Sequence, residues 1–303
     1  TQYGLDAADG DIEVSTTGNL TVNETVAAYD SGAVRLSAGG DIQQDARIRT
    51  EIGDIAVTAG GNIQQIARIT TDTGNIVLNA GGNILHDARI TADTGDISVT
   101  AGGNIQQDGH IATGTGNIVV SAGGNLVQNE LIGTTTGDIT VSAGGNLQQN
   151  ANISTQNGNL SVSADGDITM AADTDTVAYQ SGNVTIAAGG NATLQDVGTF
   201  AGNVDVSAKQ GNLLQVGQLL AGTGNVTASA GGDLTTLALT GALYAGNVNL
   251  SAGGNVSLQQ VGTTSGNIDL KAGGNLTQHQ NVVTGEGNLT AHADGDLTTL
   301  ADT

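Results

Sequence analysis

The chain has 303 residues, and its 29 Asp and Glu against 7 Lys and Arg give a formal net charge of −22 at pH 7. This charge argues against nucleic acid or an anionic membrane as a partner, because both bind proteins through Lys and Arg. The chain has no Cys, no Pro and no Trp, and only 2% of its residues are aromatic, which excludes disulfides and a bulky aromatic core as sources of its stability.

A Gly-Asn or Gly-Asp pair returns along the chain with a period of about 21 residues. The pairs form two interleaved series, one running from Asn19 to Asp296 and the other from Asp11 to Asn288. Self-similarity at such a period is typical of solenoids, and the two series predict about 14 copies of one unit. No run of apolar residues is long enough to cross a bilayer, so we expect no membrane insertion.

Residues 53–73 show how one unit is built. After the first corner, residues 55–59 carry an apolar side chain at every second position, which predicts a strand with one buried face. Gly60-Gly61-Asn62 predicts a second sharp corner, since Gly and Asn tolerate positive φ. Residues 63–69 again have strand character, and residues 70–74 lead to the next corner.

No stretch of the chain has the apolar spacing of a helix, so each strand must find its partner in the same strand of the next unit. The inward columns that contain Ile55, Val57 and Ile69 place like residues above one another. We therefore predict an all-β fold, a parallel β-helix (solenoid) of about 14 coils of about 21 residues. The crossover rule favours a right-handed coil, and a left-handed one stays open.

The corner residues are expected to be structural. They are Asn62, Asn83, Asn104, Asn125 and Asn146 in the first series, with Asn75 and Asn117 in the second. A further column contains Gln44, Gln65, Gln107, Gln128 and Gln149, with His86 in the same register. Apolar residues occupy later positions of this column, so we predict an inward ladder of stacked amides. The alternative is a polar binding groove.

The unbroken period predicts a single β-helix repeat domain over residues 1–303, which we expect to be a fragment of a longer array. A longer repeat is also visible, because residues 9–34 resemble residues 157–184. This resemblance predicts a block duplication that relates residues 9–156 to residues 157–303.

The units at residues 73–84, 94–105 and 115–126 read TGNIVLNAGGNI, TGDISVTAGGNI and TGNIVVSAGGNL. They resemble the filamentous haemagglutinin-like repeats of large bacterial exoproteins of the two-partner secretion type, although the repeats of that family are usually somewhat shorter. The resemblance covers nearly the whole chain. It implies a β-helical adhesin shaft, and export to the cell surface or beyond it.

Four of the five aromatic residues lie three or four residues before a corner. Among them, Tyr29, Tyr179 and Tyr244 are candidate glycan contacts, because aromatic rings stack on sugars. The alternative is that they fill the wider space of enlarged coils, together with Phe200.

Carboxylates also mark candidate metal ligands. Asp165, Asp167, Asp173 and Asp175 are candidates for Ca²⁺, which takes six to eight oxygen ligands. The alternative is that they are solvated turn acids, and we expect no other cofactor.

One outward column contains basic residues, and a neighbouring column contains acids. The residues are Arg47, Arg68, Arg89 and His110, and Asp45, Asp87 and Asp108. We expect the two columns to offset like-charge repulsion along the ladder.

No clustered acids and bases indicate catalysis. The acids are scattered over the corners, the four histidines share no neighbourhood with a paired nucleophile, and no loop is long enough to wall a cleft. We therefore predict no enzyme and no catalytic residue. The expected function is that of a structural rod or stalk segment of an extracellular surface protein. Two alternatives are a filament subunit that stacks end to end on itself, and an adhesin module that binds surface glycans.

Overall fold

The computed structural model describes residues 4–300, and these residues form 42 strands and no helix. The strands recur in threes, and the members of each triplet belong to three different parallel sheets of 14 strands, here sheets A, B and C. The prediction of an all-β parallel β-solenoid of about 14 coils is therefore confirmed. The right-handed winding stays a prediction.

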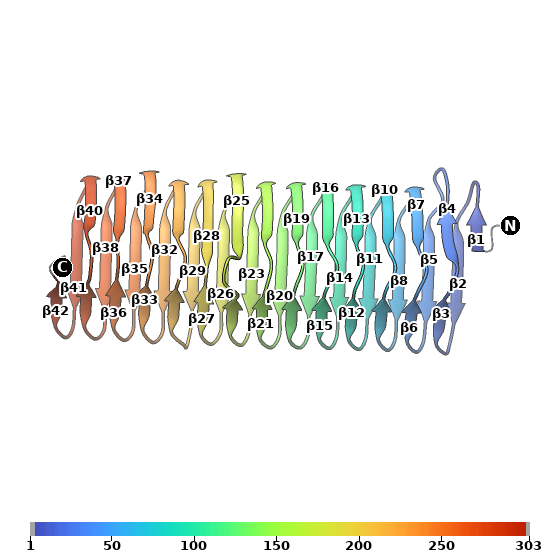
Figure 1. Ribbon diagram of the computed structural model, residues 1–303, viewed down its shortest axis with the longest axis horizontal. Coiled ribbons are helices and arrows are strands. Elements are labelled where there is room, and N and C mark those ends of the chain that lie inside the picture. The colour runs from blue at the N-terminus through green and yellow to red at the C-terminus, as the bar shows by residue number, and fades with distance from the viewer. Residues whose placement is uncertain (1–3, 301–303) are drawn as a thin grey trace. The chain divides into compact units, whose positions relative to one another are not determined.

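Contacts divide the chain into two compact units. Unit 1 comprises Thr1–Asn146 and Asn150–Ile153, and unit 2 comprises Leu147–Gln149 and Ser154–Thr303. The single repeat domain over residues 1–303 and the block duplication stay predictions. In Figure 1 the strands within a unit follow one another in chain order, so that β10, β13 and β16 of sheet A lie side by side.

Unit 1 contributes strands to all three sheets. In sheet A these are β1 (Gly4–Ala7), β4 (Thr25–Ala28), β7 (Ile48–Ile52), β10 (Ile69–Thr73), β13 (Ile90–Thr94), β16 (Ile111–Thr115) and β19 (Ile132–Thr136). In sheet B they are β2 (Ile12–Thr16), β5 (Val34–Ala38), β8 (Ile55–Ala59), β11 (Ile76–Ala80), β14 (Ile97–Ala101), β17 (Ile118–Ala122) and β20 (Ile139–Ala143). In sheet C they are β3 (Leu20–Val22), β6 (Ile42–Gln44), β9 (Ile63–Gln65), β12 (Ile84–His86), β15 (Ile105–Gln107) and β18 (Leu126–Gln128).

Unit 2 has the same three sheets. Sheet A holds β22 (Ile153–Asn157, from Ser154 on), β25 (Asp175–Ser181), β28 (Asp196–Ala201), β31 (Leu219–Thr223), β34 (Thr240–Ala245), β37 (Val261–Ser265) and β40 (Val282–Glu286). Sheet B holds β23 (Leu160–Ala164), β26 (Val184–Ala188), β29 (Val204–Ala208), β32 (Val226–Ala230), β35 (Val248–Ala252), β38 (Ile268–Ala272) and β41 (Leu289–Ala293). Sheet C holds β21 (Leu147–Gln149), β24 (Ile168–Met170), β27 (Ala192–Leu194), β30 (Leu213–Gln215), β33 (Leu234–Thr236), β36 (Val256–Leu258), β39 (Leu276–Gln278) and β42 (Leu297–Thr299).

The core consists of aliphatic columns that run from coil to coil. In sheet B of unit 1, Ile76 pairs with Ile55 on one side and with Ile97 on the other, and all three are fully buried. Their neighbours Val57 and Leu78 form a second buried column two residues on. The alternation of apolar residues therefore sets which face of each strand points inward.

Glycine is required at the corners for two reasons. Gly116 has a φ of +151°, which favours a residue without a side chain. A Cβ added there would also overlap the carbonyl oxygen of Gly95 in the preceding coil. The repeat spacing of glycine thus reflects both the local turn and the close stacking of one corner on the next.

Unit 2 contains coils that depart from the regular length. The regular strands of sheet A have five residues, whereas β25 has seven and β28 and β34 have six. A register shift lies between Ala221 and Thr223 of β31, where two residues of β34 face one residue of β31. In sheet A, β25 lies next to β28, and β31 lies between β28 and β34.

Candidate ligand-binding hollow on sheet A

The corner asparagines link successive coils. In unit 1, the side-chain Oδ1 of Asn62 accepts the backbone N–H of Asn83 at 2.8 Å, and Asn83 in turn accepts the N–H of Asn104 at 2.7 Å. The chain of bonds continues through Asn125 to Asn146, at 2.7 and 2.8 Å. Each bond satisfies a backbone donor that the sharp corner leaves without a partner in its own coil.

The second series makes the same bond at the other corner. Asn75 accepts the backbone N–H of Asp96 at 2.8 Å, and Asn117 accepts that of Asp138 at 2.9 Å. An aspartate serves equally well, because the bond to the backbone of the next coil needs only the Oδ1 acceptor. This explains why Asn and Asp alternate freely at these positions of the sequence.

The glutamine column lies inside the coils. Gln44, Gln65, Gln107, Gln128 and Gln149 are at most 1% exposed, so an external ligand cannot reach them. In unit 1, Nε2 of Gln128 donates to the carbonyl oxygen of Glu130 at 2.7 Å, and Gln65 donates likewise to Ala67. In unit 2, Gln149 donates to the carbonyl oxygen of Asp175 at 3.2 Å. Each amide thus caps a nearby backbone carbonyl.

His86 occupies one position of this column and is fully buried. It pairs in register with Gln65 and Gln107 of the adjacent coils, and its Nδ1 contacts Oε1 of Gln65. Since that oxygen only accepts, Nδ1 carries the proton of a neutral ring. Burial lowers the pKa of His86 to about 4, against the opposing effect of the carbonyls of Gly109 and His110.

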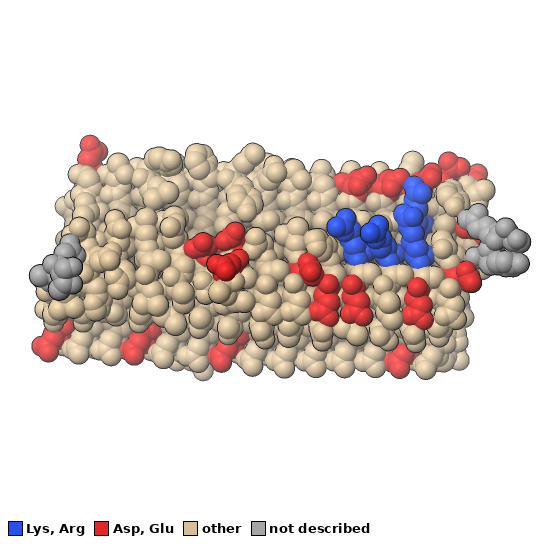
Figure 2. All heavy atoms as spheres, in the orientation of Figure 1, with Lys and Arg blue, Asp and Glu red and all other residues tan. Residues whose placement is uncertain are grey.

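The basic column does not form ion pairs with the acidic column beside it. Arg47 donates to the Thr70 hydroxyl at 3.1 Å, and His110 lies 2.8 Å from the carboxylate of Glu130. Asp45 instead accepts hydrogen bonds from the side chain of Gln43. On the face that Figure 2 shows, the visible Lys and Arg side chains gather in one region of unit 1, with acidic side chains on either side of them.

The four candidate calcium ligands have different surroundings. Oδ1 of Asp167 accepts the backbone N–H of Asn191 at 2.7 Å as part of the corner ladder. Asp173 has a φ of +60°, which marks a tight turn. Asp175 is the first residue of β25 and is paired with Asp196. Asp165 lies two residues before the corner residue Asp167. Residues 4–300 bring no group of three or more His, Asp or Glu side chains together, and calcium binding stays a prediction.

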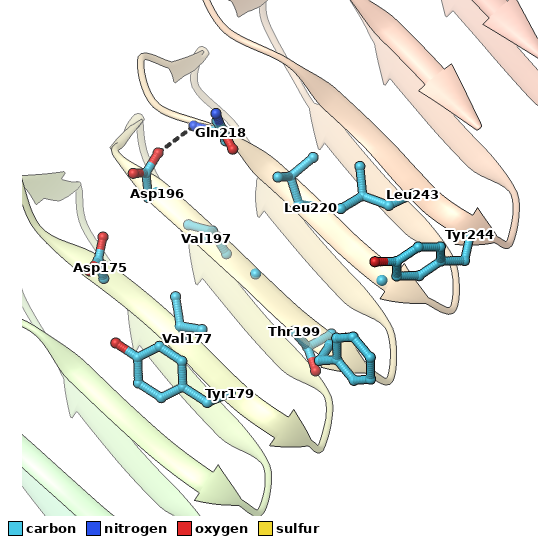
Figure 3. A pocket seen from close by; sticks show the side chains of 13 residues that line it. Asp175, Val177, Tyr179, Asp196, Val197, Thr199, Gln218, Leu220, Leu243 and Tyr244 are labelled. Atoms are coloured by element: carbon cyan, nitrogen blue, oxygen red, sulfur yellow. Dashed lines mark hydrogen bonds between the residues drawn. The ribbon is translucent and has the colours of Figure 1, made fainter. Parts of the chain in front are cut away.

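A hollow of about 350 Å³ lies on the outer face of sheet A in unit 2. It spans β25, β28, β31 and β34, and we call it the sheet-A hollow. Its defining residues are Asp175, Asp196 and Gln218 at one end, Val177, Leu220 and Leu243 in the middle, and Tyr179, Phe200 and Tyr244 at the other end. Figure 3 shows this division between a polar end and an aromatic end.

Strand register explains how the hollow is assembled. Asp175 of β25 is paired with Asp196 of β28, and Val177 is paired with Gly198. Gly198 is in turn paired with Leu220 of β31. The glycine leaves a gap between two aliphatic side chains of neighbouring coils, which forms the floor of the hollow.

The aromatic end is open to solvent. The exposed fractions of Tyr179, Phe200 and Tyr244 are 52%, 56% and 59%. The rings of Phe200 and Tyr244 meet edge to face, with their centroids 6.2 Å apart and an angle of 68° between their planes. They approach each other because Gly222 is the residue of β31 that lies between them, at the register shift, and it has no side chain to keep the rings apart.

The polar end carries two stacked carboxylates. Oδ1 of Asp196 accepts the backbone N–H of Gln218 at 2.6 Å. Burial raises the pKa of the Asp175 carboxyl above its ordinary value, and the nearby charge of Asp196 raises it further. No Lys, Arg or His lines the hollow.

The structure thus brings together two of the three tyrosines that the sequence marks as glycan contacts. Tyr179 and Tyr244 lie in the sheet-A hollow, but Tyr29 belongs to unit 1 and lies outside it. The sequence pattern alone does not single out Leu220 or Asp196 as parts of the site, whereas Phe200 belongs to the aromatic residues that it marks as unusual. The sequence does carry one sign of the hollow, namely apolar or aromatic residues at outward positions that are mostly polar in regular coils.

Comparisons of the chain with protein-family models, with curated proteins and with solved structures find no match. Residues 4–300 include no helix that is long and apolar enough to cross a lipid bilayer.

Proposed function

We propose that this chain is a structural, non-catalytic segment of an exported surface protein, namely part of the stalk or shaft of an adhesin. The observation that supports this best is the corner ladder, in which the side chain of one coil binds the backbone of the next. It recurs in unit 2, where Asn191 accepts the N–H of Asn212 at 2.9 Å and Asn212 accepts that of Asp233 at 2.8 Å. Side-chain bonds of this kind thus hold successive coils to one another.

This construction suits a stalk. The stability of stacked repeats is approximately a sum of local terms, so more coils give a longer structure without a larger core. Backbone groups that are paired from coil to coil are poor protease substrates, because a protease needs an extended, unpaired segment. The net charge of −22 favours solubility and disfavours non-specific association. Export itself is supported by the resemblance of residues 73–84 and 94–105 to haemagglutinin-type repeats.

Labelling of intact cells tests the proposed location. An antibody raised against residues 4–300 is expected to stain unpermeabilised cells or the culture medium, and added protease is expected to remove the cell-bound signal. A cytoplasmic protein detected in parallel serves as the control for cell integrity. Staining that requires lysis would contradict the proposal.

A further inference from the structure

The aromatic residues of this chain are concentrated in one place. Three of its five aromatic side chains line the sheet-A hollow, and more than half of each is exposed. Phe200 follows the buried Thr199, as Asp72 follows Thr71 and Thr135 follows Thr134 in unit 1. The regular coils of unit 1 thus place a polar residue, or glycine at Gly114, where this coil places a ring. Exposed aromatic clusters on an otherwise polar surface mark binding sites.

The two ends of the hollow match the two sides of a sugar ring. A pyranose has an apolar face of C–H groups and an edge of hydroxyl groups. The row from Tyr179 to Tyr244 can take up the C–H faces, while the carboxylates of Asp175 and Asp196 accept hydrogen bonds from hydroxyls. The row of aromatic residues and the row of carboxylates each take their members from successive strands of sheet A, which lie about 4.8 Å apart. Both rows therefore run across the strands, and a sugar chain laid in the same direction would follow both.

A peptide strand is a poorer fit to the same face. The backbone groups of sheet A are already paired from coil to coil, as in the bond from the N–H of Val197 to the carbonyl of Gln218 at 2.9 Å and that from Leu219 to Leu239 at 3.0 Å. A peptide laid over the hollow would therefore find no backbone partners. A carbohydrate needs none, because its hydroxyls bind side chains.

Charge narrows the class of carbohydrate. Asp175 and Asp196 are the charged side chains of the hollow, and no basic residue lines it. A uronate or sulfate group would add a third negative charge beside two that already repel each other. Sugars with neutral hydroxyls or with an amino group meet no such repulsion.

We propose that the sheet-A hollow binds a carbohydrate chain that lacks acidic groups, with its ring faces on Tyr179, Phe200 and Tyr244 and its hydroxyls directed toward Asp175 and Asp196. This inference is independent of the stalk function, because a chain that failed to bind carbohydrate would still carry its corner ladders.

Affinity electrophoresis of the full chain tests the proposal. The probes are gels that contain a neutral glucan, mannan, galactan or soluble chitin derivative, with polygalacturonate as the acidic comparison. At least one neutral polysaccharide is expected to retard the chain, and polygalacturonate is not. Retardation by none of the neutral polysaccharides, or equal retardation by polygalacturonate, would overturn the proposal.

Variants locate the binding. Tyr179→Ala and Tyr244→Ala are each expected to weaken binding about fivefold, the effect of losing one aromatic contact. Tyr29→Ala is the matched control, since Tyr29 lies outside the hollow, and it should bind as the wild type does. Equal losses in all three variants, each with an unchanged circular dichroism spectrum, would place binding elsewhere and overturn the proposal.

A charge variant tests the role of the two carboxylates. The double variant Asp175→Asn, Asp196→Asn is expected to be retarded less by the neutral polysaccharide, because an amide oxygen is a weaker acceptor for sugar hydroxyls than a carboxylate. Unchanged retardation would show that these carboxylates do not contact the ligand and would overturn the proposed orientation. Self-association of the chain that Tyr244→Ala abolishes would assign the hollow to a protein contact instead, and would likewise overturn the proposal.

Discussion

Replacing His86 by glutamine tests how the buried column of the solenoid responds to pH. His86 is fully buried, and its pKa is lowered from 6.5 to about 4. The flanking positions of the column hold Gln65 and Gln107, so His86→Gln extends a pattern that the fold already accommodates. At pH 7 the ring is neutral, and we expect the two proteins to differ in their free energy of unfolding by less than about 1 kcal/mol.

The difference should grow as the pH falls. Because the folded-state pKa lies below the unfolded-state value, the unfolded chain takes up the proton first. Above pH 6.5 the ring is neutral in both states, and the folded protein keeps its full stability. This stability falls as the pH drops from 6.5 toward about 4. Below both pKa values, the shift lowers the free energy of unfolding by about 3 kcal/mol. At pH 4.5 the loss is already about 2.5 kcal/mol.

Urea unfolding at pH 7 and pH 4.5, followed by circular dichroism, measures this effect. The wild type is expected to lose about 2 kcal/mol more than His86→Gln between the two pH values. Titration of the carboxylates is common to both proteins and cancels in the comparison. His110→Gln is the control, since its ring is exposed and paired with Glu130, and it should follow the wild type. Equal pH dependence of the wild type and His86→Gln would refute the reasoning.

Two further substitutions test the corners of the coil. Asn104→Ala removes the acceptor for the backbone N–H of Asn125 and should lower the free energy of unfolding by about 1 kcal/mol in urea, whereas Asn79→Ala on the exposed face of β11 should change it by less than about 0.5 kcal/mol. A loss at Asn79 as large as that at Asn104 would argue against the ladder. Gly116→Ala combines a φ of +151° with an overlap on Gly95 and should cost at least about 2 kcal/mol in a thermal melt. Its control is Gly262→Ala, where the nearest atom to an added Cβ is the carbonyl oxygen of Val283 at 3.6 Å; a comparable loss there would show that glycine is needed for some other reason.

The coils could be predicted because each one repeats the same local choices. The alternation around Ile76 fixes the buried face, and the corner glycines fix where the strand ends, so the register of Ile55, Ile76 and Ile97 follows from the period alone. Like residues then meet in columns, and no information from distant parts of the chain is needed.

The sheet-A hollow depends on departures from that period. The register shift at β34 places Leu243 and Tyr244 opposite the single residue Gly222. The repeat pattern does not predict this shift. The aromatic residues could be recognised as unusual, but which of them meet depends on the lengths of the intervening coils. Tyr29 therefore looked equivalent to Tyr179 in the sequence and lies outside the hollow.

The partners of the exposed charged side chains could not be predicted from the sequence either. The spacing of Arg47 and Asp45 predicts neighbouring columns of opposite charge, but Asp45 accepts hydrogen bonds from Gln43, two residues before it in the same coil. Long charged side chains have several partners within reach, and the free-energy differences between exposed pairs are small.

The denatured mass of the native polypeptide that contains these residues tests the proposed stalk most directly. The 303 residues account for 29.9 kDa. A mass several times larger, with the polypeptide on the cell surface, is the result expected of a shaft segment in a large exoprotein. A mass near 29.9 kDa, together with fibres that form as the concentration rises, would contradict the stalk and establish a subunit that assembles end to end.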